Sequence, residues 1–313
     1  MMPDKNKPGT LSLPHPRYTG ETPFGSCYQQ SVANLLEWQG LGDAADAIGM
    51  SWGFSWTSGD FLEGSGRWLE SVRTVHGTDL EDLRFPLAGA ALEFERESVA
   101  SGHPVAAAVD SYFLPSPFEN QRHITHCVLV IGADSTGVQV VDPMNNVSPA
   151  FYGFDDWVRM RSASCAQESR TFLVRSKPDR VPGPLRLARA LADDLRAGKE
   201  RDEAALSAYL TACDEGIVTG TPDVSGVAAE RLYLALFLKA LAQRLPGLRP
   251  AVEAVSSLER RWYLAHTLAI EPGGVSRARH IRLIRDLGQR ELEQRRRTLA
   301  LLEALPDDTE ENE

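Results

Sequence analysis

The sequence predicts an α+β fold in which an antiparallel sheet is followed by an all-α half. Short apolar runs of strand length lie between residues 104 and 143, and two of them flank the turn-forming segment 134–137, as in a hairpin. Residues 176–184 then carry three prolines and a glycine, and beyond them apolar residues recur only at helical spacing. This change of pattern divides the chain into a mixed half and a helical half.

The elements of the mixed half follow from the same patterns. Helices are expected over residues 27–40, 43–48, 65–76 and 88–101, and strands over 104–110, 127–132, 138–143 and 171–175. In the helical half, helices are expected over residues 185–198, 202–214, 227–245, 251–269 and 276–305. We therefore expect a flexible lead-in (1–20), a mixed domain (21–178), a helical domain (179–305) and a disordered acidic tail (306–313).

Composition narrows the functional classes. The chain has 313 residues, of which 42% are hydrophobic and 24% charged, and its formal net charge is −10. A strongly negative chain is not expected to bind nucleic acid over its whole surface. The first ten residues lack the apolar core of a signal peptide, and no run approaches the roughly 18 apolar residues of a membrane span. A soluble, cytoplasmic protein is expected, with the oligomeric state open and a homodimer among the possibilities.

The four cysteines favour neither a zinc site nor a disulfide framework, because they lie far apart and form no CxxC pair. Cys27 stands out, since it follows a Pro/Gly-bearing turn and immediately precedes an apolar-periodic segment. Free N–H groups and the positive dipole end at a helix N-terminus stabilise a thiolate and can hold an oxyanion. Cys27 is therefore a candidate nucleophile, although most buried cysteines serve only as small apolar residues.

His126 and Asp142, further along the chain, complete a candidate catalytic set with Cys27. A cysteine nucleophile needs a base for its proton, and the base needs a partner that fixes its tautomer. His126 opens one strand of the predicted hairpin and Asp142 ends the other, so both are expected at one edge of the sheet. Asp142 could instead only start a turn before Pro143.

Other residues compete for these roles. His123 is an alternative base, and His103 is expected at the surface. Strand alternation directs Cys127 away from His126, into the core. A zinc site built from His123, His126 and Cys127 would match no common ligand spacing.

Aromatic residues supply candidate substrate contacts. Residues 50–61 are rich in glycine and aromatic side chains, and a buried loop is the simplest interpretation of any one ring. As a group, Trp52, Phe54 and Trp56 could instead line a substrate groove, together with Tyr112.

The ordered set of motifs resembles the butirosin biosynthesis protein H family, which consists of papain-like cysteine acyltransferases with a C-terminal helical domain. The resemblance covers most of the chain. It rests on the motifs at residues 25–27 and 31–40, 49–56, 102–115, 126–134, 140–143, 229–238 and 261–265. It implies that residues 21–178 form a papain-like catalytic domain.

The resemblance also implies a reaction. Cys27 would take an acyl group from the phosphopantetheine thioester of an acyl carrier protein, and an amine would then attack the acyl-enzyme to form an amide in natural-product biosynthesis. By position, Cys27 would be the nucleophile, His126 the general base and acid, and Asp142 the orienting carboxylate. No cofactor is expected beyond the carrier's own arm, and the acceptor would be a small-molecule amine.

One position departs from the papain-like pattern. Glu21 stands where an oxyanion-hole glutamine is expected, and its carboxylate could not donate a hydrogen bond. Losing one such donor typically costs ~3 kcal/mol. Gln29 and Gln30 are expected to point along the helix, and Tyr112 is a distant alternative donor.

An arginine-rich helix supplies a candidate docking surface. Residues 276–297 carry eight arginines and three acidic residues in a chain of negative net charge. The segment Arg277–Arg297 could bind an acidic carrier protein, or it could be an ordinary solvated helix.

Two other functions remain open at this level. The same three residues could pass the acyl group to water, as in a thioesterase, amidase or peptidase. The missing glutamine would also suit a papain-like scaffold that serves as a non-catalytic binding module.

Overall fold

The computed structural model describes residues 11, 26–41, 48–115, 120–143, 147–176, 182–270 and 275–306. The chain divides into two units. The sheet unit consists of Met1–Glu21, Cys27–Ala45 and Gly77–Asp179, and the helical unit of Thr22–Ser26, Asp46–His76 and Arg180–Glu313. Each unit is described by itself below.

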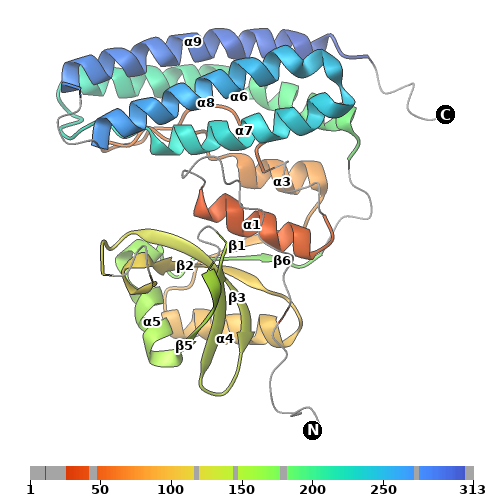
Figure 1. Ribbon diagram of the computed structural model, residues 1–313, viewed down its shortest axis with the longest axis vertical. Coiled ribbons are helices and arrows are strands. Elements are labelled where there is room, and N and C mark those ends of the chain that lie inside the picture. The colour runs from red at the N-terminus through yellow and green to blue at the C-terminus, as the bar shows by residue number, and fades with distance from the viewer. Residues whose placement is uncertain are drawn as a thin grey trace. The chain divides into compact units, whose positions relative to one another are not determined.

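The sheet unit is built on a six-stranded sheet whose paired strands are all antiparallel, in the order β1-β6-β2-β3-β4-β5 (Figure 1). Its strands are β1 (Leu80–Leu83), β2 (Val105–Asp110), β3 (Thr125–Ala133), β4 (Gly137–Asp142), β5 (Val147–Gly153) and β6 (Thr171–Val174). The hairpin expected from the sequence is β3–β4, in which Leu129 pairs with Val141 and Ala133 with Val138. Because β2 and β4 flank β3 and run antiparallel to it, the end of β2, the start of β3 and the end of β4 lie at the same end of the sheet.

Helices cover both faces of this sheet (Figure 1). On one face, α4 (Ala88–Ala100) and α5 (Phe154–Ser162) bury Leu92 and Trp157 against Val128 and Val130. On the other face, α1 (Cys27–Trp38) packs on β3, β2 and β6. Short 3₁₀ turns, η1 (Ser111–Phe113) and η2 (Ser164–Ala166), follow β2 and α5.

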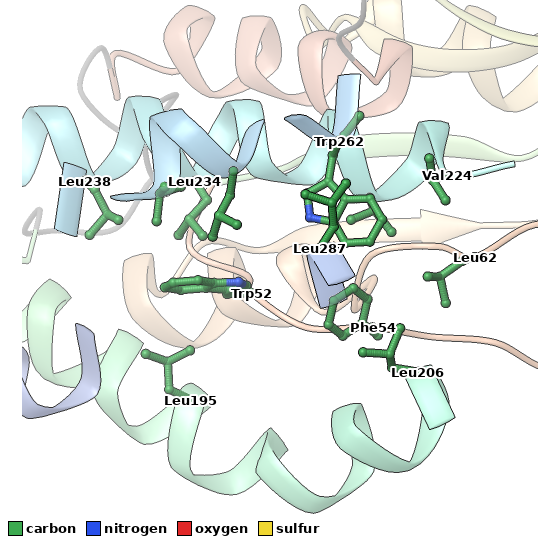
Figure 2. Packing of buried hydrophobic residues seen from close by; sticks show 14 of the residues in the cluster. Trp52, Phe54, Leu62, Leu195, Leu206, Val224, Leu234, Leu238, Trp262 and Leu287 are labelled. Carbon is green, nitrogen blue, oxygen red and sulfur yellow. The ribbon is translucent and has the colours of Figure 1, made fainter. Parts of the chain in front are cut away.

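The helical unit contains the long helices of the second half (Figure 1). They are α6 (Pro184–Asp214), α7 (Ser225–Arg244), α8 (Arg249–Ile270) and α9 (Arg277–Glu303), with α3 (Trp68–His76) and the 3₁₀ turn η3 (Pro246–Leu248). Their apolar faces meet in one core, part of which is drawn in Figure 2. Trp52, Phe54 and Leu62 enter that core from an irregular segment that precedes α3, among Leu195, Leu206, Leu234, Trp262 and Leu287.

The predicted α+β class is confirmed, as are the antiparallel sheet and the helical second half. The two helices expected over 185–198 and 202–214 are one helix, α6, because residues 199–201 are helix-forming Lys, Glu and Arg and interrupt nothing. The elements β1, β5 and α5 are not expected from the sequence patterns.

The domain arrangement differs from the continuous mixed domain expected over 21–178. Asp46–His76 belongs to the helical unit, although it lies between two segments of the sheet unit in the sequence. The helix expected over 43–48 falls almost wholly outside the described residues. So do the lead-in, apart from Leu11, and the tail beyond Pro306.

Within the described ranges, none of the helices combines the length and the apolar character that crossing a membrane would require.

Candidate active site

Cys27 is the first residue of α1, as the sequence predicts. The N–H groups of the first helical turn have no partner within the helix, and the helix dipole adds partial positive charge there. The cysteine is partly exposed and free of any disulfide. Its sulfur therefore lies where negative charge is stabilised and a substrate can reach.

Ser31 attaches this end of α1 to the sheet. It lies four residues after Cys27, so both face the same side of the helix. The Ser31 Oγ donates a hydrogen bond to the backbone carbonyl of Cys127 at 3.3 Å, and Ser31 is fully buried. Because Cys127 follows His126 directly, this contact holds the first turn of α1 over the strand that carries the histidine.

His126 and Asp142 meet at the end of the sheet where β3 begins and β4 ends. The His126 Nε2 lies 3.0 Å from the Asp142 Oδ2. A carboxylate only accepts hydrogen bonds, so Nε2 carries the proton and donates it to Asp142. Both side chains are buried, with exposed fractions of 3% and 7%. Nδ1 is then the ring nitrogen left for Cys27.

The electrostatics of His126 favour its charged form. Burial by itself lowers the pKa of His126, but hydrogen bonds with Asp142 and with Cys27 outweigh burial and raise that pKa to about 10. An imidazolium beside a thiol stabilises the thiolate. The arrangement can therefore hold a reactive sulfur anion and return a proton to a leaving group.

Cys127 lies in the core, as expected, with no exposed surface. Burial, and secondarily the nearby Cys27, raise the pKa of its thiol. The thiol of Cys127 is therefore unreactive.

Tyr28 packs edge-on against Phe172 with ring centroids 5.5 Å apart, and the Arg170 guanidinium lies over both rings. These contacts fix α1 against β6.

His123 has a different partner from His126. Its Nδ1 lies 2.7 Å from the Oδ2 of Asp110, the last residue of β2. Tyr112, one of the expected substrate contacts, stacks on the His123 ring with a centroid separation of 4.2 Å. Across the described ranges, no three His, Cys, Asp or Glu side chains converge as metal ligands, so His123, His126 and Cys127 do not form the zinc site considered above.

The prediction that Trp52, Phe54 and Trp56 line a substrate groove is wrong for Trp52 and Phe54. Trp52 and Phe54 are buried in the helical unit with 0% and 2% exposure (Figure 2). The Trp52 indole N–H donates a 2.9 Å hydrogen bond to the Glu291 carboxylate. Trp56 is half-buried beside Tyr209 and donates to the carbonyl of Gly59. The aromatic residues fill a core because apolar area is worth most when it is removed from water.

Buried charges hold this aromatic segment in the helical unit. Arg231 forms ion pairs with Glu230 at 2.6 Å and Glu291 at 2.5 Å, and it donates to the Gly53 carbonyl at 2.6 Å. A side chain at position 53 would collide with Asp202, since a Cβ there would lie 2.4 Å from its carboxylate. The glycine in this motif therefore allows a close approach of backbone to helix.

The expected docking helix, α9, does not present all its arginines. Arg295 is 5% exposed and lies 2.6 Å from the buried Asp202, so it belongs to the interior of the helical unit. Arg296 and Arg297 are exposed but pair with Glu203 and Glu293. Arg279, Arg282 and Arg290 are exposed and form no ion pair with other residues that the structure describes.

Three positions near Cys27 bear on the second oxyanion donor, namely Glu21, Gln29 and Gln30. Glu21, the position that departs from the papain-like pattern, lies outside the described residues. Gln29 and Gln30 follow Cys27 in the first turn of α1 and are 3% and 5% exposed, so both amides are directed into the protein rather than into solvent. His103, which the sequence placed at the surface, is only partly exposed, and its ring forms a T-shaped contact with Trp38 within the sheet unit.

No protein-family model matches the chain, and no curated protein matches it. Among solved structures, the chain is similar to a crystal structure from Bacillus anthracis described as a "putative C39-like peptidase", with 15% sequence identity and a TM-score of 0.34. The match covers 52% of this chain and 98% of that one.

Proposed function

We propose that this protein is a cysteine-dependent acyltransferase that takes an acyl group from a carrier-bound phosphopantetheine thioester and passes it to an amine. The observation that carries the proposal is the hydrogen-bonded series from Cys27 to His126 to Asp142, with the sulfur at a helix N-terminus. The choice of donor and acceptor rests on the resemblance of the ordered motifs to the butirosin biosynthesis protein H family.

In the first half-reaction the Cys27 thiolate attacks the thioester carbonyl. The carbon–sulfur bond to the pantetheine arm breaks, and the leaving thiolate takes the proton from the His126 imidazolium. The product is an acyl-Cys27 thioester beside a neutral imidazole. Asp142 holds the ring so that the same nitrogen can give and later receive this proton.

In the second half-reaction a neutral amine attacks acyl-Cys27. The amine nitrogen gives a proton to His126 as the carbon–nitrogen bond forms, and Cys27 leaves as the thiolate. This restores the thiolate–imidazolium pair and releases an amide. Water in place of the amine would give the hydrolase that the sequence leaves open.

Intact-mass spectrometry separates these functions. The protein is incubated with an acyl-pantetheine or acyl-carrier thioester, and a propylamine solution is then added. We expect an acyl mass on the wild type, none on Cys27→Ala, and amide as the main product of release. Release mainly as free acid would favour a hydrolase, and the absence of an adduct with every thioester would favour a binding module.

An acidic carrier protein would dock on α9 at the exposed Arg279, Arg282 and Arg290. These three replace the wider Arg277–Arg297 surface. Arg295 is buried, Arg277 donates to the Cys213 carbonyl, and the ion-paired arginines are Arg285, Arg296 and Arg297.

A further inference from the structure

A second histidine–carboxylate pair lies at the same end of the sheet as the candidate active site. Asp110 ends β2 and is 1% exposed, whereas the His123 side chain is 62% exposed. The two are joined by the 2.7 Å contact between Nδ1 and Oδ2. Because the carboxylate accepts at Nδ1, Nε2 of His123 is the nitrogen on the open side of the ring.

The His123 imidazole is held from two directions. The Oδ1 of Asp110 accepts the backbone N–H of Tyr112 at 3.0 Å, so the carboxylate itself is fixed. The Tyr112 ring lies nearly parallel to the imidazole, at an angle of 14°. An exposed imidazole with a buried carboxylate behind it and a flat ring against it is oriented before any ligand arrives, as a general base requires.

The strand register places the backbone of Asp110 near that of His126. Asp110 pairs with Thr125, and Val109 pairs with His126. The backbone of Asp110 is therefore one strand and one residue away from that of His126, and neighbouring strands lie about 4.8 Å apart. The pair and the candidate active site therefore lie at the same end of these strands.

The proposed reaction needs a base that the first three residues do not supply. An alkylamine is protonated at neutral pH, so it must lose one proton before it can attack and a second as it forms the amide. His126 accepts only the second of these protons. Hydrolysis has no such requirement, since water attacks with a single proton transfer to His126.

We propose that the Asp110–His123 pair is a second acid–base site, which takes the first proton from an ammonium acceptor. The Nε2 of His123 accepts the proton from R–NH₃⁺, leaving R–NH₂ to attack acyl-Cys27, and the exposed imidazolium then releases the proton to water. The inference rests on the proposed transferase function and names a catalytic residue for its second half-reaction.

The surrounding charges are compatible with this role. Cys165 of η2 hydrogen-bonds to Asp110, and burial and the Asp110 charge raise the pKa of the Cys165 thiol, so that it stays neutral. Arg159 of α5 lies over the Phe113 ring, 4.7 Å from its centroid, and that ring contacts His123 edge-on. Asp110 is thus the one negative charge bonded to the imidazole among the described residues.

The test compares two acceptors in H123Q, with H103Q as the matched control. His103 is a histidine of the same unit whose ring also contacts an aromatic side chain, Trp38. The donor is an acyl-pantetheine thioester, and the acceptors are propylamine, which is protonated at pH 7, and hydroxylamine, which is largely neutral there. H123F, which keeps a flat ring against Tyr112 but has no base, serves as the second variant.

We expect H123Q and H123F to form acyl-Cys27 at the wild-type rate and to react normally with hydroxylamine. Their reaction with propylamine at pH 7 should fall by roughly 10²-fold, the usual scale of general-base catalysis. Raising the pH should bring the propylamine rates of both variants back to the wild-type rate, because bulk hydroxide then supplies the neutral amine. H103Q should behave as wild type throughout.

Equal losses with both amines, or no loss with propylamine, would overturn the assignment of His123 while leaving acylation of Cys27 intact. Failure of the wild type to form an adduct would overturn the proposed function and this inference together. The mass of the acyl-enzyme thus distinguishes the two failures.

Discussion

The Nε2 of His126 and the Oδ2 of Asp142 lie 3.0 Å apart in a site where both side chains are buried. This contact fixes which ring nitrogen faces Cys27 and contributes to the raised pKa of the imidazole. A neutral acceptor in place of Asp142 would keep the orientation, whereas a methyl group would lose both the orientation and the charge.

We therefore expect Asp142→Ala to slow acylation of Cys27 by about 10²–10⁴-fold, the range of general acid–base effects. Asp142→Asn should slow it less, because the amide oxygen can still accept from Nε2. It should also move the alkaline limb of the pH–rate profile to lower pH, since the charge that raises the pKa of His126 is gone. Single-turnover rates by quenched mass spectrometry measure both effects. Equal rates for the two variants would contradict the orienting role.

The raised pKa of His126 also predicts how stability depends on pH. The folded protein keeps the His126 proton up to about pH 10, whereas an unfolded histidine loses it near pH 6.5. Because folded His126 holds the proton that Cys27 gives up, the folded state binds more protons only above about pH 8.5, where the thiol of the unfolded chain also titrates, and this contribution is lost as the pH rises from there to about 10. The slope is at most about 1.4 kcal/mol per pH unit.

Urea unfolding of wild type and His126→Gln over this pH range gives the measurement. We expect the difference between their unfolding free energies to shrink as the pH rises from about 8.5 to about 10. A difference that stays constant, or that grows, over this interval would show that His126 is neutral in the folded protein.

Trp52 is expected to act through stability rather than substrate binding. Trp52→Ala removes a fully buried ring, and a change of this kind costs about 3–5 kcal/mol. Trp56→Ala should cost less, because Trp56 is only half-buried. Denaturant unfolding measures both values. A variant of Trp52 that kept its stability but raised KM would support the groove that the sequence suggested.

Charge reversals on α9 separate its surface from its interior. Arg295→Glu would place a second negative charge beside the buried Asp202 and should destabilise the protein by about 3–5 kcal/mol. The triple change of Arg279, Arg282 and Arg290 to Glu should leave the melting temperature nearly unchanged. It should raise KM for a carrier-bound donor by about tenfold, through lost electrostatic steering, and spare a free pantetheine thioester. Equal effects on both donors would exclude docking at these residues.

Local patterns were enough to predict Cys27 at a helix start and His126 and Asp142 on paired strands, because each depends on a few neighbouring residues. They favoured His126 over His123 as the base only because His126 directly abuts the strand. The choice is made by β2, which carries Asp110 and binds His123. The Asp110–His123 pair itself left one signal in the sequence, a carboxylate ending a predicted strand.

The aromatic segment shows where local reasoning fails. Trp52 and Phe54 satisfy the description of a groove wall and of a core equally well in sequence. Their burial depends on helices more than a hundred residues away, which supply Leu195, Trp262 and Glu291. Arg295 was misplaced for the same reason, because its partner Asp202 comes from α6.

The proposed function requires Cys27 to be an activated nucleophile, and Cys165 of the same unit provides the internal control. Both cysteines are partly exposed, but burial and the nearby Asp110 raise the pKa of Cys165 and keep it as the thiol. The measurement is the rate of iodoacetamide alkylation of each cysteine at pH 6, read by peptide mapping in wild type and His126→Ala. We predict that Cys27 reacts at least about tenfold faster than Cys165 and loses that advantage without His126. Equal rates for the two cysteines in the wild type would contradict the account.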